Sequence, residues 1–199
     1  EAYPLLLAAL LLTGGALGDR LGRLRIFGAG IALFALASLA CGLAPTFEVL
    51  VSARCVQAIG AALLVTAALA VLTGVRGDED RAVALWVAAG VLGAALGPAA
   101  GGILTELLGW QSIFVAQVPL ALVPLIALRG VAVVPSRGRA GRPRLRANAA
   151  LLLLSGGLVG ALFLLVLLLV EGWGLSPAEA GVVVTVMPLA AIVAARRAT

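Results

Sequence analysis

The sequence predicts an all-α integral membrane protein with seven transmembrane helices. Composition, apolar runs of spanning length and the placement of the arginines all support this class. Of the 199 residues, 63% are hydrophobic and 12% are charged, with a mean hydropathy of +1.18. Soluble chains are nearer half apolar and a quarter charged, and one folded core of this size cannot hide so much apolar surface from water. Lipid must therefore cover the remainder.

Seven apolar runs approach or exceed the roughly 20 residues that cross a bilayer as a helix. They cover residues 2–18, 26–44, 48–75, 82–104, 113–134, 147–170 and 179–195. The connections are short, so we expect neighbouring helices to run antiparallel. The chain starts inside the first run without a recognisable signal peptide, and we expect one preceding helix to be missing.

The arginines are predicted to lie on one side of the membrane. All 14 basic residues are Arg, and 13 of them fall in or near alternate connections, whereas the other connections carry only Glu at or near them. The positive-inside rule makes the arginine-rich side cytoplasmic, and we expect a multi-pass protein of a bacterial cell membrane. Lipid is then an expected partner and nucleic acid is not. Cys41 and Cys55 lie in different runs, which favours two small buried residues over a disulfide or metal site.

Helix-end residues support these boundaries. Ser176, Pro177 and Glu179 form a capping-box pattern, with Pro at the first helical position of the last run. Three carboxylates at residues 78–80 precede the fourth run, where they complement the positive end of the helix dipole. Thr46 is placed to cap the third run.

Residues 15–25 read GALGDRLGRLR and form the first arginine-rich connection. Gly22 permits a tight reversal without a Cβ penalty, and Asp19 can approach a positive helix N-terminus. The segment resembles the loop between helices 2 and 3 of the major facilitator superfamily, G-x-L-a-D-r-x-G-r-R/K. The resemblance implies a conformational latch, whereas charge placement alone indicates a topogenic turn. The candidate latch residues are Gly15, Asp19, Arg20, Gly22 and Arg23.

Residues 54–62 read RCVQAIGAA and lie within the third run. Arg54 follows Glu48 by six residues, which places it about 9 Å deeper along a helix. A cation at that depth costs about 3 kcal/mol or more unless it is paired or hydrated. The segment resembles the helix 4 signature of the family, R-x-x-Q-G-x-G-a-A, with Ala58 replacing the first Gly. The resemblance implies that Arg54 and Gln57 lie on the proton or substrate pathway; the alternative is that Arg54 snorkels to the outer interface.

Residues 93–102 read GAALGPAAGG and lie in the fourth run. Small residues recur there every four positions, which leaves a nearly bare helix face for a close neighbour. Pro98 removes a backbone hydrogen bond and should bend the helix. The segment resembles the helix 5 signature of drug:proton antiporters within the superfamily, and plain helix packing is the alternative. The antiporter motif residues are Gly93, Gly97, Pro98, Gly101 and Gly102.

Two further segments complete the resemblance. Residues 110–119 are similar to the helix 6 pattern W-R-W-I-F-x-x-N-x-P, with departures at Gln111, Ser112 and Gln117. Residues 172–181 resemble the G-x-S-P-x-x-A-G element of the second half. In family order the runs correspond to helices 2 to 8. The implied organisation is residues 1–134 with helices 2–6, a basic cytoplasmic linker at residues 135–146, and residues 147–199 with helices 7 and 8.

The resemblance implies a secondary active transporter that exports small amphipathic compounds or drugs in exchange for protons. Such transporters hold substrate between two halves of the bundle, so this chain is expected to need the missing helices, including a helix 1 that usually carries an acidic residue. The alternatives are a metabolite transporter of the same family, a truncated non-functional fragment, and a seven-helix receptor. A membrane enzyme is disfavoured because the sequence has no His, no acidic pair within a run and no metal-ligand cluster. No catalytic residue, cofactor or metal is expected.

Overall fold

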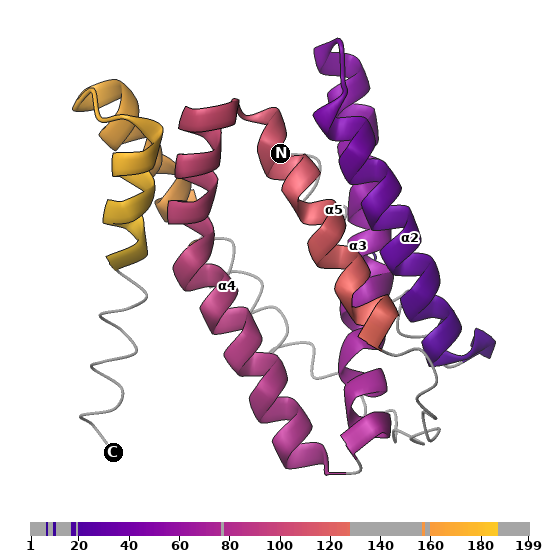
Figure 1. Cartoon of the computed structure of the whole chain (residues 1–199). Coiled ribbons are helices and arrows are strands. Elements are labelled where there is room, and N and C mark those ends of the chain that lie inside the picture. The colour runs from indigo at the N-terminus through magenta and orange to yellow at the C-terminus, as the bar shows by residue number, and fades with distance from the viewer. Residues whose placement is uncertain are drawn as a thin grey trace, which may run out of the picture. The chain divides into compact units, whose positions relative to one another are not determined.

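The computed structural model describes residues 7, 10, 17–18, 20–76, 78–127, 157 and 160–186. Every regular element in these residues is helical (Figure 1). Three helices are long and apolar enough to cross a membrane, namely Arg23–Gly42, Phe47–Val75 and Glu79–Leu108. Shorter apolar helices cover Gln111–Ile126, Gly160–Gly172 and Pro177–Val186. The all-helical class is confirmed. Most of run 2–18 and much of the last two runs lie outside the described residues, so the count of seven stays a prediction.

Four of the predicted runs match long helices, each of which starts within three residues of the predicted start. The helices are α2 (Arg23–Gly42), α3 (Phe47–Arg76), α4 (Glu79–Leu108) and α5 (Gln111–Ala127). The starts of α2 and α4 precede the predicted starts by three residues. The reason is that charged residues, such as Arg23 in α2 and Glu79 in α4, belong to the first helical turn although they interrupt the apolar pattern.

Side-chain caps define three helix starts. The hydroxyl of Thr46 accepts a hydrogen bond from the Val49 N–H at 3.4 Å, and Asp78 accepts one from the Arg81 N–H at 3.1 Å. The predicted capping box is confirmed, because the Ser176 N–H donates to the Glu179 carboxylate at 2.9 Å and the Glu179 N–H donates to the Ser176 hydroxyl at 3.3 Å. Each bond satisfies a donor that has no partner within its own helix.

Two glycines set helix boundaries through a left-handed backbone. Gly22 has φ 96° immediately before α2, which confirms its predicted role in the tight turn. Gly109 has φ 85° after α4, and its N–H donates to the Thr105 carbonyl at 3.0 Å. Residues with a Cβ rarely adopt this backbone region, so glycine is the favoured residue at both turns.

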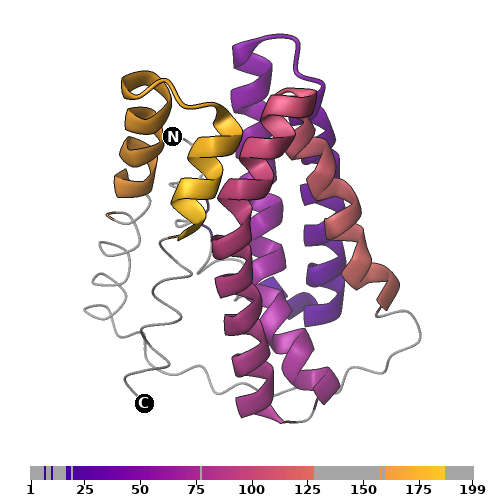
Figure 2. The same cartoon turned by 60° about the vertical axis from the view of Figure 1, so that its left-hand side comes forward.

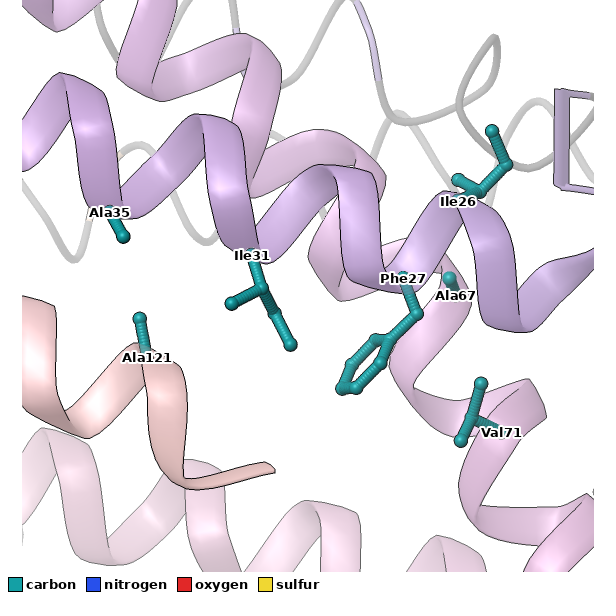
Figure 3. Close-up of a cluster of buried hydrophobic side chains, with 7 residues drawn as sticks. All are labelled: Ile26, Phe27, Ile31, Ala35, Ala67, Val71 and Ala121. Atoms are coloured by element: carbon teal, nitrogen blue, oxygen red, sulfur yellow. The ribbon is translucent and has the colours of Figure 1, made fainter. Parts of the chain in front are cut away.

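The described residues fall into two compact units. The first unit takes in residues 1–87 and 111–137, and the second takes in residues 88–110 and 138–199. In the first, α2 packs against both α3 and α5 (Figure 1). Its core joins seven buried side chains from these three helices, with Ile31 and Ala35 of α2 pointing toward Ala121 of α5 (Figure 3).

The second unit contains α4 beyond Val87 and the helices Gly160–Gly172 and Pro177–Val186. Helix Gly160–Gly172 ends in a π-helical turn, Leu168–Gly172. The core of this unit contains Leu169, Ala180 and Val184. Helix Pro177–Val186 runs beside the C-terminal part of α4 (Figures 1 and 2). The predicted linker at residues 135–146 lies outside the described residues, so the predicted division into 1–134 and 147–199 stays a prediction.

Candidate functional site

Arg54 lies two turns into α3, with its guanidinium directed at polar and aromatic partners. Its Nη1 donates to the Gln57 side-chain oxygen at 2.6 Å, one turn further along the same helix. The guanidinium carbon lies 5.4 Å from the ring centroid of Phe114 in α5, within cation–π range. Arg54 is only partly buried. These contacts compensate part of the energetic cost of placing a cation inside an apolar helix.

Gln57 joins three helices through its side-chain amide. It is fully buried (0% exposed). The amide nitrogen donates to the Ser38 hydroxyl of α2 at 2.7 Å and to the Gln117 side-chain oxygen of α5 at 3.0 Å. The Cys41 sulfur lies 4.0 Å from the Gln57 oxygen. We call Ser38, Cys41, Arg54, Gln57 and Gln117 the polar cluster.

Glycines allow α2 and α3 to approach closely enough for this cluster to form. A Cβ added at Gly60, one turn past Gln57, would lie 2.6 Å from the Phe34 nitrogen of α2. A Cβ added at Gly30 would lie 2.7 Å from the Leu64 nitrogen of α3. Real Cβ atoms do not approach backbone so closely, so both positions require glycine or a shifted helix. Gly60 belongs to the segment that resembles the helix 4 signature.

The antiporter motif residues lie in the second unit, where part of the motif contacts helix Pro177–Val186. A Cβ at Gly102 would overlap the Pro177 carbonyl oxygen, and a Cβ at Gly181 would overlap the Pro98 carbonyl oxygen. Backbone therefore meets backbone at this crossing. By contrast, among the described residues no atom outside the local backbone of α4 lies within 4 Å of a Cβ built on Gly93 or Gly97. The motif thus makes its close contact at its C-terminal end.

Two hydrogen bonds join the same pair of helices. The Ala99 N–H, next to Pro98, donates to the Thr185 hydroxyl at 3.2 Å, and this hydroxyl donates to the Gly181 carbonyl at 2.9 Å. The Ala178 N–H donates to the Glu106 carboxylate at 3.1 Å. Pro98 has no N–H and disturbs the local helical bonding, so a hydroxyl from the neighbouring helix provides an acceptor for the next N–H.

The candidate latch residues are only partly described. Gly15 and Asp19 lie outside the described residues. Arg20 is exposed, Arg23 is partly buried, and Gly22 has the left-handed backbone given above. The described residues therefore show the turn of this loop, and its role as a latch stays a prediction.

Arg54 and Gln57 were singled out as candidates from the sequence, but the residues that contact them were not predicted. Gln117 was noted only as a departure from the helix 6 pattern, and Ser38 was not singled out at all. Thr185 and Glu106 gave no signal of their contacts with α4 and helix Pro177–Val186. The available signal was the rarity of amide and hydroxyl groups at mid-span, because polar groups inside a membrane bundle usually hydrogen-bond to one another.

Two features are typical of multi-pass membrane transport proteins. One is a buried polar cluster between apolar helices, and the other is a close contact between two helices at proline and glycine residues. Within the described residues, no group of three His, Cys, Asp or Glu could hold a metal ion. Comparison with known families specifies the class further. The chain belongs to the Major Facilitator Superfamily, whose family model matches residues 2–196. The family is one of multi-pass membrane transporters, so this membership favours transport over enzyme chemistry.

Curated relatives are resistance and efflux proteins. The chain is 41% identical over 141 residues to the methylenomycin A resistance protein of Bacillus subtilis, covering 69% of this chain and 30% of that protein. It is 41% identical over 133 residues to the drug efflux pump JefA of Mycobacterium tuberculosis, covering 65% and 26%. It is 39% identical over 158 residues to the methyl viologen resistance protein SmvA of Salmonella typhimurium, covering 78% and 32%. The match therefore spans about a third or less of each relative.

Proposed function

We propose that this chain is part of a secondary transporter that exports small amphipathic compounds in exchange for protons. The main support is Arg54, a permanent cation held inside an apolar helix by Gln57 and Phe114. The three relatives described above are named as resistance or drug efflux proteins, which supports drug-like compounds over metabolites as substrates. Because the chain matches only part of each relative, the missing helices are expected to complete the substrate site.

Arg54 acts through its charge. A guanidinium stays protonated across the physiological pH range, so Arg54 cannot carry the exchanged proton itself. A fixed cation in a low-dielectric pocket lowers the proton affinity of any carboxyl group that faces it. All nine carboxylates of the sequence lie at or near the ends of the predicted runs. We therefore propose that the proton-carrying carboxyl group belongs to the missing helices and that Arg54 promotes its deprotonation.

Orientation follows from the arginines. We propose that the arginine-rich connections face the cytoplasm and that the protein resides in the cell membrane, with lipid headgroups around Arg20 and Arg25. Under this orientation α2 begins at the cytoplasmic side, and Arg54 and Glu48 of α3 lie toward the outer side. Protons entering from outside then encounter the polar cluster in the outer part of the bundle.

The test is dye efflux from cells that express the full-length protein. Ethidium, an amphipathic cation, is loaded, and its loss is followed by fluorescence with and without a protonophore. We expect efflux to be protonophore-sensitive. We expect Arg54→Ala to reduce the efflux rate by about tenfold or more, because removing a charged group from a functional site commonly has an effect of this size. Cys55→Ser, one residue along α3, is the matched control. Efflux that is unchanged by Arg54→Ala would remove the role assigned to this arginine.

A further inference from the structure

We infer that Gln117 is a positioning residue that holds the Gln57 amide in one orientation and thereby fixes Arg54. This inference rests on the proposed function for the role of Arg54, but the geometry that supports it comes from α2, α3 and α5 alone. The question is which way the Gln57 amide faces, since its oxygen and nitrogen differ in hydrogen-bonding capacity.

Two independent constraints give the same orientation. The Ser38 hydroxyl donates its only proton to the Phe34 carbonyl at 2.7 Å, so toward Gln57 it can only accept. The amide nitrogen must therefore face Ser38. On the other side, Arg54 has donors and no acceptor, so the Gln57 oxygen must face its guanidinium. Hydrogen-bond donation thus runs in one direction, from the Gln57 amide to the Ser38 hydroxyl and from this hydroxyl to the α2 backbone.

Gln117 completes this network by taking the second amide proton. Its oxygen lies 3.0 Å from the Gln57 nitrogen. With both N–H groups engaged by α2 and α5, the Gln57 side chain is fixed from two helices, and its oxygen remains at 2.6 Å from the Arg54 Nη1. Without Gln117, one buried N–H loses its acceptor and the amide is held from one side only. As a consequence, the Gln57 oxygen that accepts from the Arg54 guanidinium is no longer held in one position.

The first arm of the test measures order in the cluster without transport. In the full-length protein, Cys55→Ser and replacement of any further cysteines leave Cys41 as a thiol reporter, which is buried and lies 4.0 Å from the Gln57 oxygen. We expect Gln117→Met, similar in length but without an acceptor at its end, to speed N-ethylmaleimide labelling of Cys41 by about tenfold, because a lost buried hydrogen bond lowers the cost of local opening by roughly this factor. Gln117→Glu keeps an acceptor and is expected to label more slowly than Gln117→Met. Cys55 in a Cys41→Ala background is the control and should be unaffected.

The second arm measures transport by a double-mutant cycle. We expect Gln117→Met to reduce proton-driven ethidium efflux by about tenfold and to shift its pH profile, with Gln117→Glu restoring at least part of the rate. In an Arg54→Gln background, Gln117→Met should cause no further loss, because the residue that it positions is gone. Losses that multiply, or equal behaviour of Met and Glu at position 117, would overturn the inference.

The two arms separate the inference from the proposed function. If the unaltered protein shows no protonophore-sensitive efflux, the exporter proposal fails while Cys41 labelling still decides whether Gln117 orders the cluster. If efflux is protonophore-sensitive but Cys41 is labelled at the same rate with and without Gln117→Met in the background that keeps only Cys41, the positioning role of Gln117 is wrong and the proposed function stands.

Discussion

The two units hold their helices together in different ways. In the first, α2, α3 and α5 meet through the polar cluster, in which Gln57 engages side chains from both neighbouring helices. In the second, α4 meets helix Pro177–Val186 through Gly102 and Gly181, where backbone lies against backbone. A buried polar side chain fixes the relative orientation of the helices that it hydrogen-bonds, and one substitution of that side chain removes these bonds. A glycine crossing instead fixes the distance between two helix backbones, and any added side chain forces them apart. The two regions should therefore respond differently to the same kind of mutation.

The largest expected effect is at the glycine crossing. Gly102→Ala places a methyl group on the Pro177 carbonyl, which must move, and we expect a loss of about 3 kcal/mol of stability, at the upper end for overpacking. Thermal unfolding of the full-length protein in detergent measures this loss. Gly93→Ala is the matched control, because in the described part of the chain its Cβ meets no atom beyond the local helix backbone within 4 Å, and alanine favours the helix. Equal melting temperatures for the two variants would contradict the backbone contact.

A smaller effect is expected at the polar cluster. Gln57→Leu removes the oxygen that accepts from the Arg54 Nη1 and leaves Ser38 and Gln117 without the bonds that they make to this amide. We expect a loss of about 2 kcal/mol, because buried polar groups that lose a partner are destabilising. The same unfolding measurement applies, with Cys55→Ser as a control outside the cluster. A Gln57→Leu protein as stable as the control would show that the cluster contributes no stability.

The smallest effect is expected at Thr185. Thr185→Val keeps the shape of the side chain but removes the acceptor of the Ala99 N–H, and we expect a loss of about 1 kcal/mol or less, the range for interhelical hydrogen bonds in membranes. Thr185→Ser keeps the hydroxyl and should lose less. If Val and Ser destabilise equally, this bond contributes no more stability than the methyl group that Ser lacks.

Local features of the sequence predicted much of the fold. Helix existence followed from apolar length, and the capping box at Ser176 and Glu179 was found because its residues are neighbours in sequence. The turn at Gly22 followed from backbone sterics. The starts of α2 and α4 were placed three residues late because Arg23 and Glu79 are helical yet charged. These results depend on short-range chemistry, which a single sequence displays directly.

Contacts between helices were harder to predict. Arg54 and Gln57 are three residues apart on one helix, so their proximity followed from periodicity. Their partner Gln117 is 60 residues beyond Gln57, and nothing in the local pattern indicates that the two side chains meet. The glycine repeat predicted a helix face open to a close neighbour, and among the described residues Gly102 makes a close approach while Gly93 and Gly97 do not. Gly102 is one residue past the repeat and therefore faces about 100° away from it.

The most direct test of the account is substrate-driven proton movement in proteoliposomes that contain the full-length protein. An imposed ethidium gradient should drive protons in the opposite direction, detected with an entrapped pH-sensitive dye. In Arg54→Gln we expect the proton signal to fall by about tenfold or more relative to ethidium movement, because the fixed charge that promotes proton release is absent. An unchanged ratio of proton to ethidium movement in Arg54→Gln would contradict the account.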